Sequence, residues 1–188
     1  MTKSQADVVR TALEILDELG AEAVSMRAIA QRLDVRMNTV LWHVKSKARL
    51  EELMADAIVA GVSLDDLPRH WRERAAEIAR RYRHALLAHR DGAAVVAGTY
   101  AAEPATLDTA EALVAALLDG GLSEREAAWT CWSLIYFVLG LAQEEQALPR
   151  GPQGLDVGER SALRRVLPFL REESFDERFE FGVAKLLA

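Results

Sequence analysis

Hydrophobic side chains recur along this chain with the spacing of an α-helix. From Ser4 onward, one apolar stripe contains Val8, Ala12, Ile15, Leu16 and Leu19. Ser4 and Asp7 form a capping signal in front of the stripe, and Gly20 is a typical stop behind it. Because strand-like alternation is scarce in the rest of the sequence, the pattern predicts an all-α protein.

Further helices follow the first one. The pattern predicts short helices over about residues 26–33 and 37–44, and another from 47 to about 61. Pro68 suits the first turn of a long helix that reaches about His89. Later helices are expected at about 91–99, 104–118, 123–146, 159–170 and 175–187. Residues 147–158, rich in proline and glycine, are predicted to form a surface loop.

The longest apolar run, from Ala127 to Ala142, is shorter than the roughly 20 residues that a membrane span needs. Charged residues flank it on both sides, so we predict a buried helix and no membrane partner. A helix that is apolar all round is covered from several sides, which favours packing in a core or against a second copy. The last predicted helix carries one apolar face, made of Phe175, Phe179, Val183 and Leu187.

Charge is unevenly distributed along the chain. The formal net charge is -6, yet residues 23–49 hold six basic side chains and a single acidic one, Asp34. A basic patch at one end of an acidic body is typical of a local nucleic-acid contact. The single cysteine, Cys131, cannot form a disulfide framework or a cysteine-based zinc site. With no secretory signal at the start of the sequence, this favours a cytoplasmic protein.

Residues 26–47 have the spacing of a helix-turn-helix. Ala30 is small enough for two helices to cross closely, and the predicted shared core consists of Ile29, Leu33, Val35, Val40 and Val44. Asp34 stands at the turn, where aspartate tolerates the left-handed conformation better than most residues. We therefore expect a DNA-binding domain over residues 1–46 and a larger helical domain over residues 47–188.

With those apolar side chains turned inward, the second short helix presents its remaining residues to solvent. In a major groove Asn38 can pair with adenine, and Thr39 and Leu41 can touch a thymine methyl group. Trp42, His43 and Lys47 can reach sugar and phosphate, and Arg27, at the start of the preceding helix, can reach guanine or a phosphate. The complete predicted contact set is Met26, Arg27, Met37, Asn38, Thr39, Leu41, Trp42, His43 and Lys47. The alternative is a helical subdomain with a solvated basic face.

Residues 20–54 resemble the DNA-binding domain of the TetR family of bacterial repressors, whose T-x-x-x-H-x-x-x-K signature is matched by Thr39, His43 and Lys47. Three later segments, LLAHRDGAAVVAGT, FVLGLAQEEQ and FDERFEFGVAKLL, resemble the ligand-binding domain of its tetracycline-type members. The resemblance implies that residues 47–188 serve ligand binding and dimerisation. The homodimer would pair through residues of about 123–146 and 175–187 and bind a palindromic double-stranded operator. A small-molecule effector in the second domain would rotate the fourth helix and separate the two DNA-binding heads.

The resemblance also assigns positions to a ligand. Val96 stands where tetracycline-type repressors have the histidine that binds the drug's magnesium, while Ser63, Ile78 and Tyr100 replace histidine, asparagine and arginine. Thr99 and Glu144 match residues that assist the metal through water in those repressors, and Tyr82 matches a position that is aromatic there. Because valine offers no lone pair, we predict no metal site, no cofactor and no response to magnesium-tetracycline.

The predicted pocket therefore suits a largely apolar or aromatic molecule. It is expected to draw on Ser63, Ile78, Tyr82, Val96, Thr99, Tyr100, Trp132, Tyr136 and Glu144. Aromatic residues at helical spacing are often packing residues instead, so Trp129, Trp132 and Tyr136 could equally belong to a core or a dimer interface. Cys131 is expected to be a packing residue.

Signs of an enzyme are weak. His89, Arg90 and Asp91 match the kinase catalytic triplet, but the asparagine that kinases need five residues later is Val96. Adjacent Glu144 and Glu145 point in different directions on a helix, so they do not form a carboxylate pair. We expect a regulator and interpret residues 89–91 as a structural or coupling junction. A small-molecule binding protein with an incidental basic end, or a small helical enzyme, are the alternatives.

Overall fold

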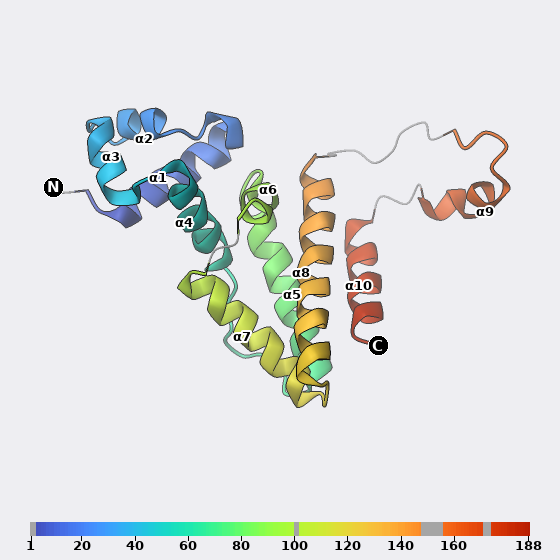
Figure 1. The fold of residues 1–188 in the computed structure, drawn as a ribbon. Coiled ribbons are helices and arrows are strands. Elements are labelled where there is room, and N and C mark those ends of the chain that lie inside the picture. Colours follow the sequence, from blue (N-terminus) through green and yellow to red (C-terminus); the bar gives the residue numbers. More distant parts are fainter. Residues whose placement is uncertain (1–2, 100–101, 148–155, 171–173) are drawn as a thin grey trace.

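The computed structural model describes residues 3–99, 102–147, 156–170 and 174–188, and these residues form helices and connecting turns without a strand (Figure 1). The helices are α1 (Gln5–Leu19), α2 (Met26–Arg32), α3 (Met37–Val44), α4 (Lys47–Val59), α5 (Trp71–Leu87), α6 (Gly92–Ala97), α7 (Pro104–Asp119), α8 (Glu124–Ala147), α9 (Ser161–Leu170) and α10 (Phe175–Leu186). A short 3-10 turn, Ala21–Ala23, follows α1. The all-α prediction is confirmed.

The start of α5 differs from the prediction. The helix begins at Trp71 and not at Pro68, because the preceding segment is held as a turn. Arg81 Nη1 donates to the backbone carbonyl oxygens of Ser63 and Asp65 at 2.8 and 2.6 Å. These carbonyls are fixed by a side chain from the body of α5, so the turn is closed before the helix starts. The predicted loop at 147–158 falls mostly outside the described residues.

The N-terminal part is built from α1, α2 and α3 around a common core (Figure 1, blue). Ile15, Leu16, Ile29, Val40 and Val44 are at most 1% exposed. A capping box at Ser4 begins α1, and Gly20 ends it at φ 87. One member of the predicted apolar stripe is exposed. The side chain of Leu19, the last residue of α1, is 59% exposed to solvent, because the chain turns away at Gly20.

The C-terminal part consists of long helices that run side by side, with the short α6 between α4, α5 and α8 (Figure 1). The close contact of α8 with α10 depends on Gly182, since a Cβ atom there would lie 2.1 Å from Cζ of Phe137. Phe137 in turn stacks on Phe179 with 6.3 Å between ring centroids. On the predicted face of α10, Phe179, Val183 and Leu187 are buried and Phe175 is half-buried.

The apolar helix α8 is buried along one stripe only in the single chain. That stripe consists of Ala127, Cys131, Leu134, Val138 and Ala142. Trp129 and Tyr136 are 60% and 58% exposed on other faces, so the single chain leaves these faces of α8 uncovered. No helix among the described residues is both long enough and apolar enough to span a membrane.

Candidate functional site

The helix-turn-helix forms with the predicted limits for α3 and within one residue for α2. Ser25 caps α2 by accepting a hydrogen bond from the Ala28 amide at 3.1 Å. Asp34 adopts the left-handed conformation at φ 53, which lets the Val35 amide donate to the Ala30 carbonyl at 3.0 Å. Ala30 is 4% exposed at the crossing of the two helices. The sequence therefore sets both the turn and the close helix contact.

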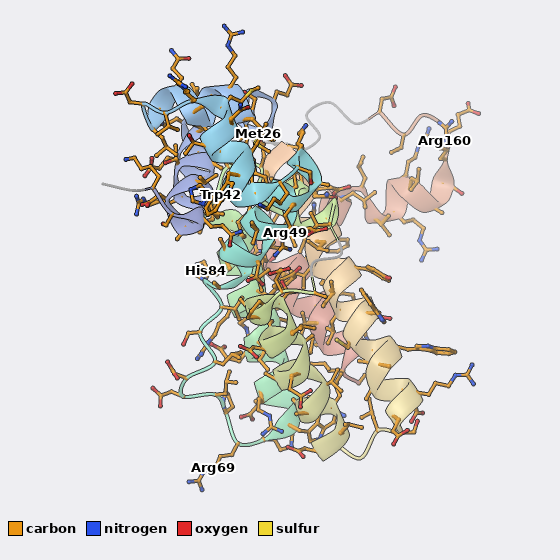
Figure 2. The ribbon with its side chains drawn as sticks, turned by 60° about the vertical axis from the view of Figure 1, so that its left-hand side comes forward. Met26, Trp42, Arg49, Arg69, His84 and Arg160 are labelled. Carbon is orange, nitrogen blue, oxygen red and sulfur yellow. The ribbon has the colours of Figure 1, made fainter. Side chains whose placement is uncertain are left out.

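The outer face of α3 carries a large exposed aromatic side chain. Trp42 is 69% exposed and Met37 49%, and Asn38 is exposed beside them. His43 meets the Trp42 ring edge-on at 4.8 Å between centroids, and Lys45 Nζ lies 5.4 Å from the same ring. Figure 2 shows Met26 and Trp42 in this N-terminal part. A rigid aromatic group with a cation beside it is well suited to a polyanionic surface.

Three residues that were predicted to face solvent are less exposed than expected. Thr39, Leu41 and His43 are half-buried, because α3 is short and packs against both α1 and α2. Met26, on α2, is also half-buried. The His43 carbonyl accepts a hydrogen bond from Gln5 Nε2 at 2.9 Å, which ties α1 to the end of α3. Arg27 and Lys47 are exposed, together with Met37, Asn38 and Trp42. All nine predicted residues belong to α2, α3 and the first turn of α4.

Part of the basic charge in this region is used within the protein. Arg32 forms a two-pronged ion pair with Glu18 at 2.6 and 2.7 Å. Arg49, at the start of α4, pairs with Glu52 at 2.9 Å and with Glu103 in front of α7, and this guanidinium lowers the pKa of the Glu103 carboxyl group. The charge count of the sequence therefore overstates the free basic surface, since neither arginine is available to a ligand without losing its partner.

A cavity of about 570 Å³ lies in the C-terminal part, bounded by residues of α4, α5, α6, α7 and α8. Five predicted pocket residues line it: Tyr82, Val96, Thr99, Trp132 and Tyr136. The volume is within the range that holds a drug-sized molecule. Trp132 and Tyr136 stack on each other at 5.4 Å between centroids and remain 46% and 58% exposed, so they stand at the mouth of the cavity.

Three predicted pocket residues do not line this cavity. Ser63 is exposed in the turn before α5, where its hydroxyl accepts from the Asp65 amide. Ile78 is 1% exposed and borders a separate small void behind Tyr82. Glu144 is exposed on α8, and its neighbour Gln143 lines the cavity in its place. The structure places these three residues away from the cavity wall, and Tyr100 lies outside the described residues.

The cavity also uses residues that sequence reasoning missed. Among these are Ala55, Val59, Thr106, Thr109, Cys131 and Gln143. Starting from Trp132 and Tyr136, steps of three and four residues along α8 reach Leu139 and then Gln143. Helical periodicity could therefore have found Gln143. Nothing in the local pattern of α4 or α7 marks the other wall residues.

The described wall of the cavity is electrically neutral. None of the described residues that line it is acidic or basic. Burial raises the pKa of the Tyr82 hydroxyl and of the Cys131 thiol, so both groups stay protonated at neutral pH. A magnesium ion needs oxygen donors, whereas Val96 is aliphatic and Glu144 lies off the wall. The described residues therefore do not fit a metal.

One helix is common to both regions. The N-terminal half of α4 follows the helix-turn-helix and packs on α1, while Ala55 and Val59 from its second half line the cavity. Asp56, on the same helix, accepts hydrogen bonds from the Thr106 amide at 2.8 Å and the Thr106 hydroxyl at 2.9 Å. Thr106 is itself a wall residue. Two hydrogen bonds thus join the α7 wall of the cavity directly to α4.

Residues 89–91 form a second junction between the two parts. Asp91 stands at φ 57 in front of α6, and its carboxylate accepts from the Ala21 amide at 2.9 Å. His89 Nδ1 lies 3.0 Å from the Asp17 carboxylate on α1, and the His89 carbonyl accepts from Gln146 Nε2 of α8 at 2.7 Å. The segment is a structural joint with hydrogen bonds to α1 and α8.

Similarity to known proteins extends over the whole chain. Residues 64–188 match the family described as "Tetracyclin repressor-like, C-terminal domain". The chain is 34% identical to the tetracycline repressor protein class A from transposon 1721 of Escherichia coli, over all of this chain and 90% of that protein.

Solved structures with the same fold include regulators bound to different partners. A possible TetR family transcriptional regulator from Streptomyces coelicolor A3(2) has a TM-score of 0.85 and 37% identity, covering 98% of this chain and 97% of its own. ActR from Streptomyces coelicolor, in complex with actinorhodin, has a TM-score of 0.89 and 28% identity, with 100% and 96% covered. BioQ with its double-stranded DNA operator has a TM-score of 0.74 and 29% identity, with 98% of both chains covered.

Proposed function

The chain belongs to the TetR family of transcriptional regulators, and from this premise we propose how its two sites work together. It is a ligand-responsive repressor that binds a palindromic operator as a cytoplasmic homodimer. A small, largely apolar or aromatic molecule enters the cavity and releases the DNA. The relatives that were solved with an operator or with actinorhodin support both halves of this proposal.

The observation that carries the proposal is the double role of α4. This helix directly follows the helix-turn-helix, and its Ala55 and Val59 line the cavity. A molecule that presses on the wall displaces Thr106 and therefore Asp56, which is hydrogen bonded to it. Since α4 is continuous, movement of its second half tilts the attached DNA-binding head. In a dimer, tilting both heads changes their separation and their fit to two half-sites.

For DNA we propose that α3 enters the major groove. The exposed Asn38 supplies base readout, and Trp42 packs against the sugar-phosphate backbone. Lys47, 74% exposed and 3.5 Å from Glu51, supplies a phosphate contact. The half-buried Thr39, Leu41 and His43 then act at the edge of the contact. A DNA-binding domain of residues 1–46, joined through α4 to the remainder, is part of this proposal.

For the dimer we propose pairing through α8 and α10. Trp129 on α8 and Phe181 on α10 are 60% and 66% exposed in the single chain. Exposed aromatic side chains on adjacent helices are typical of a surface that a second copy covers. A four-helix bundle made of both copies of α8 and α10 would bury them.

The effector is proposed to differ from magnesium-tetracycline. Tetracycline repressors are among the relatives, but Val96 brings an aliphatic side chain to the cavity wall and Glu144 is exposed beside it. An uncharged cavity with Trp132 and Tyr136 at its mouth favours aromatic molecules without a bound metal.

Selection from random-sequence duplex DNA tests this function. The protein is incubated with the duplex library, bound DNA is recovered and sequenced, and the mass of the complex is measured. We expect an inverted repeat occupied by two subunits. Recovery of no preferred sequence would refute the repressor function and favour a small-molecule binding protein with an incidental basic end. Recovery of a single, non-repeated half-site would contradict the homodimer.

A further inference from the structure

Two buried residues of the cavity wall carry a hydroxyl group that has no hydrogen-bond partner among the described residues. Tyr82 on α5 is 7% exposed and Thr109 on α7 is 6% exposed. The other wall threonines are satisfied within the protein, because Thr99 donates to the Val96 carbonyl and Thr106 donates to Asp56. The hydroxyls of Tyr82 and Thr109 are therefore set apart from the rest of the described wall.

These two oxygens face the cavity. Among the described residues, the fully enclosed side-chain polar atom without a partner is Arg74 Nε, so the hydroxyls of Tyr82 and Thr109 are not sealed inside the protein. Both residues line the cavity, and with Ile135 they also border the small void of about 10 Å³ beside it. Water that enters the cavity can bond to these hydroxyls, and a ligand that displaces this water without accepting their hydrogen bonds leaves them unpaired, which is unfavourable. A ligand oxygen that accepts from them avoids this loss.

The surroundings limit what such a ligand can be. The described wall carries no acidic or basic residue. An ionised group brought into this space would lose its hydration without gaining a counter-ion, which is strongly unfavourable. Beyond the hydroxyls, most of the wall is aliphatic or aromatic. The site thus combines a largely apolar wall with a few uncharged polar groups, among them the hydroxyls of Tyr82 and Thr109.

We propose that Tyr82 and Thr109 select uncharged aromatic effectors by donating hydrogen bonds to a single carbonyl oxygen. The ring system occupies the apolar part of the cavity, and the carbonyl points to the inner wall between α5 and α7. This inference rests on the proposed function in that it treats the cavity as the effector site. It goes further by naming the recognising residues and the chemical group that they recognise.

Three aromatic probes of similar shape test the proposal on the protein alone. They are 2-acetylnaphthalene, which carries a carbonyl, 2-ethylnaphthalene, which lacks it, and 2-naphthoate, which is an anion. Their dissociation constants are measured by calorimetry and by quenching of tryptophan fluorescence. Two net hydrogen bonds predict that the ketone binds about tenfold more tightly than the hydrocarbon. The anion is expected to bind at least about tenfold more weakly than the ketone.

Near-isosteric variants then assign the preference to residues. Tyr82→Phe and Thr109→Val should each reduce the preference for the ketone to about threefold while leaving the affinity for 2-ethylnaphthalene unchanged. The retained hydrocarbon affinity also reports an intact cavity. Ser133→Ala is the matched control, because it removes an exposed hydroxyl group of α8 that does not line the cavity, and the tenfold preference should remain.

Several results would overturn this assignment. Equal affinity for the ketone and the hydrocarbon would do so, as would a preference that survives in both variants or failure of the ketone to bind up to its solubility limit. These measurements need no DNA, so their failure is separate from failure of the repressor function, which DNA selection reports. A protein that selects no operator could still show the ketone preference, and the reverse also holds.

Discussion

Asp56→Ala should destabilise the protein by removing a cap that α4 provides to α7. Glu103, in the N-cap position of α7, makes no side-chain cap, and Pro104 has no amide hydrogen. The Thr106 amide donates instead to Asp56 at 2.8 Å, and the Thr106 hydroxyl donates to the same oxygen at 2.9 Å. Asp56 thus satisfies an otherwise open helix terminus from a neighbouring helix.

The size of the effect follows from these two bonds. Hydrogen bonds to a charged group contribute about 1.5–3 kcal/mol each when buried, and an N-cap contributes about 1 kcal/mol. Because Asp56 is half-buried, solvent screening reduces the first figure, and we expect a loss of about 2 kcal/mol. For a chain of this size the melting temperature then falls by about 4–8 °C. Asp56→Asn, which keeps one acceptor oxygen, should lose about half as much.

The assay is thermal unfolding followed by circular dichroism, with urea unfolding as a second measure. Glu111→Ala is the matched control, since Glu111 is an exposed carboxylate on α7, the helix that Asp56 caps. If Asp56→Ala melts within about 1 °C of this control, the cap contributes nothing and α4 is not anchored to the cavity wall in this way. A double variant with Thr106→Val should lose less than the sum of the single variants.

Three further predictions follow from other parts of the molecule. The Ser4 backbone amide, then the Ser4 hydroxyl and Arg10, lower the pKa of Asp7 from 3.8 to about 2, so the stabilisation from this capping box is present above pH 3.8 and lost as the pH falls through about 2. By NMR titration, Ser4→Ala should raise this pKa while leaving it below 3.8, and an unchanged value would argue against the hydroxyl contact. Gly182→Ala should lower the melting temperature, because the added Cβ clashes with the Phe137 ring. Gly140→Ala is the control and should leave the melting temperature unchanged, since no atom lies within 4 Å of its added Cβ. Equal melting temperatures for the two variants would show that α10 shifts freely. Magnesium-tetracycline should leave the melting temperature unchanged because the described wall lacks charged and imidazole ligands, and a clear rise would contradict that account of the site.

Local signals in the sequence predicted the helix-turn-helix well. Its turn depends on Asp34 and its crossing on Ala30, and both act within a few residues of their position. The start of α5 was predicted less well, since Arg81 closes the preceding turn from more than ten residues away. The prediction relied on Pro68, and a single proline gives no information about a contact made by a residue so much later in the chain.

Only part of the cavity wall was predicted. A resemblance between sequences identifies equivalent positions along the chain, but it does not tell which way each side chain points. Val96 and Tyr82 line the wall as expected. Glu144 does not, since successive residues on a helix point about 100° apart, and Gln143 turns inward in its place. Charge counting had a similar limit, because the partner of Arg49 that lies in front of α7 is 54 residues away.

The central claim is that the exposed surface of α3 and the start of α4 binds operator DNA, and the operator affinity of one variant on each helix tests it most directly. Trp42→Ala and Lys47→Ala are titrated against a selected duplex by fluorescence anisotropy at several salt concentrations, with the fold checked by circular dichroism and the dimer by light scattering. Both variants should keep the wild-type fold and dimer and bind DNA more weakly, and Lys47→Ala should reduce the salt slope by about one phosphate contact. Unchanged affinity in both variants would contradict DNA recognition by this surface.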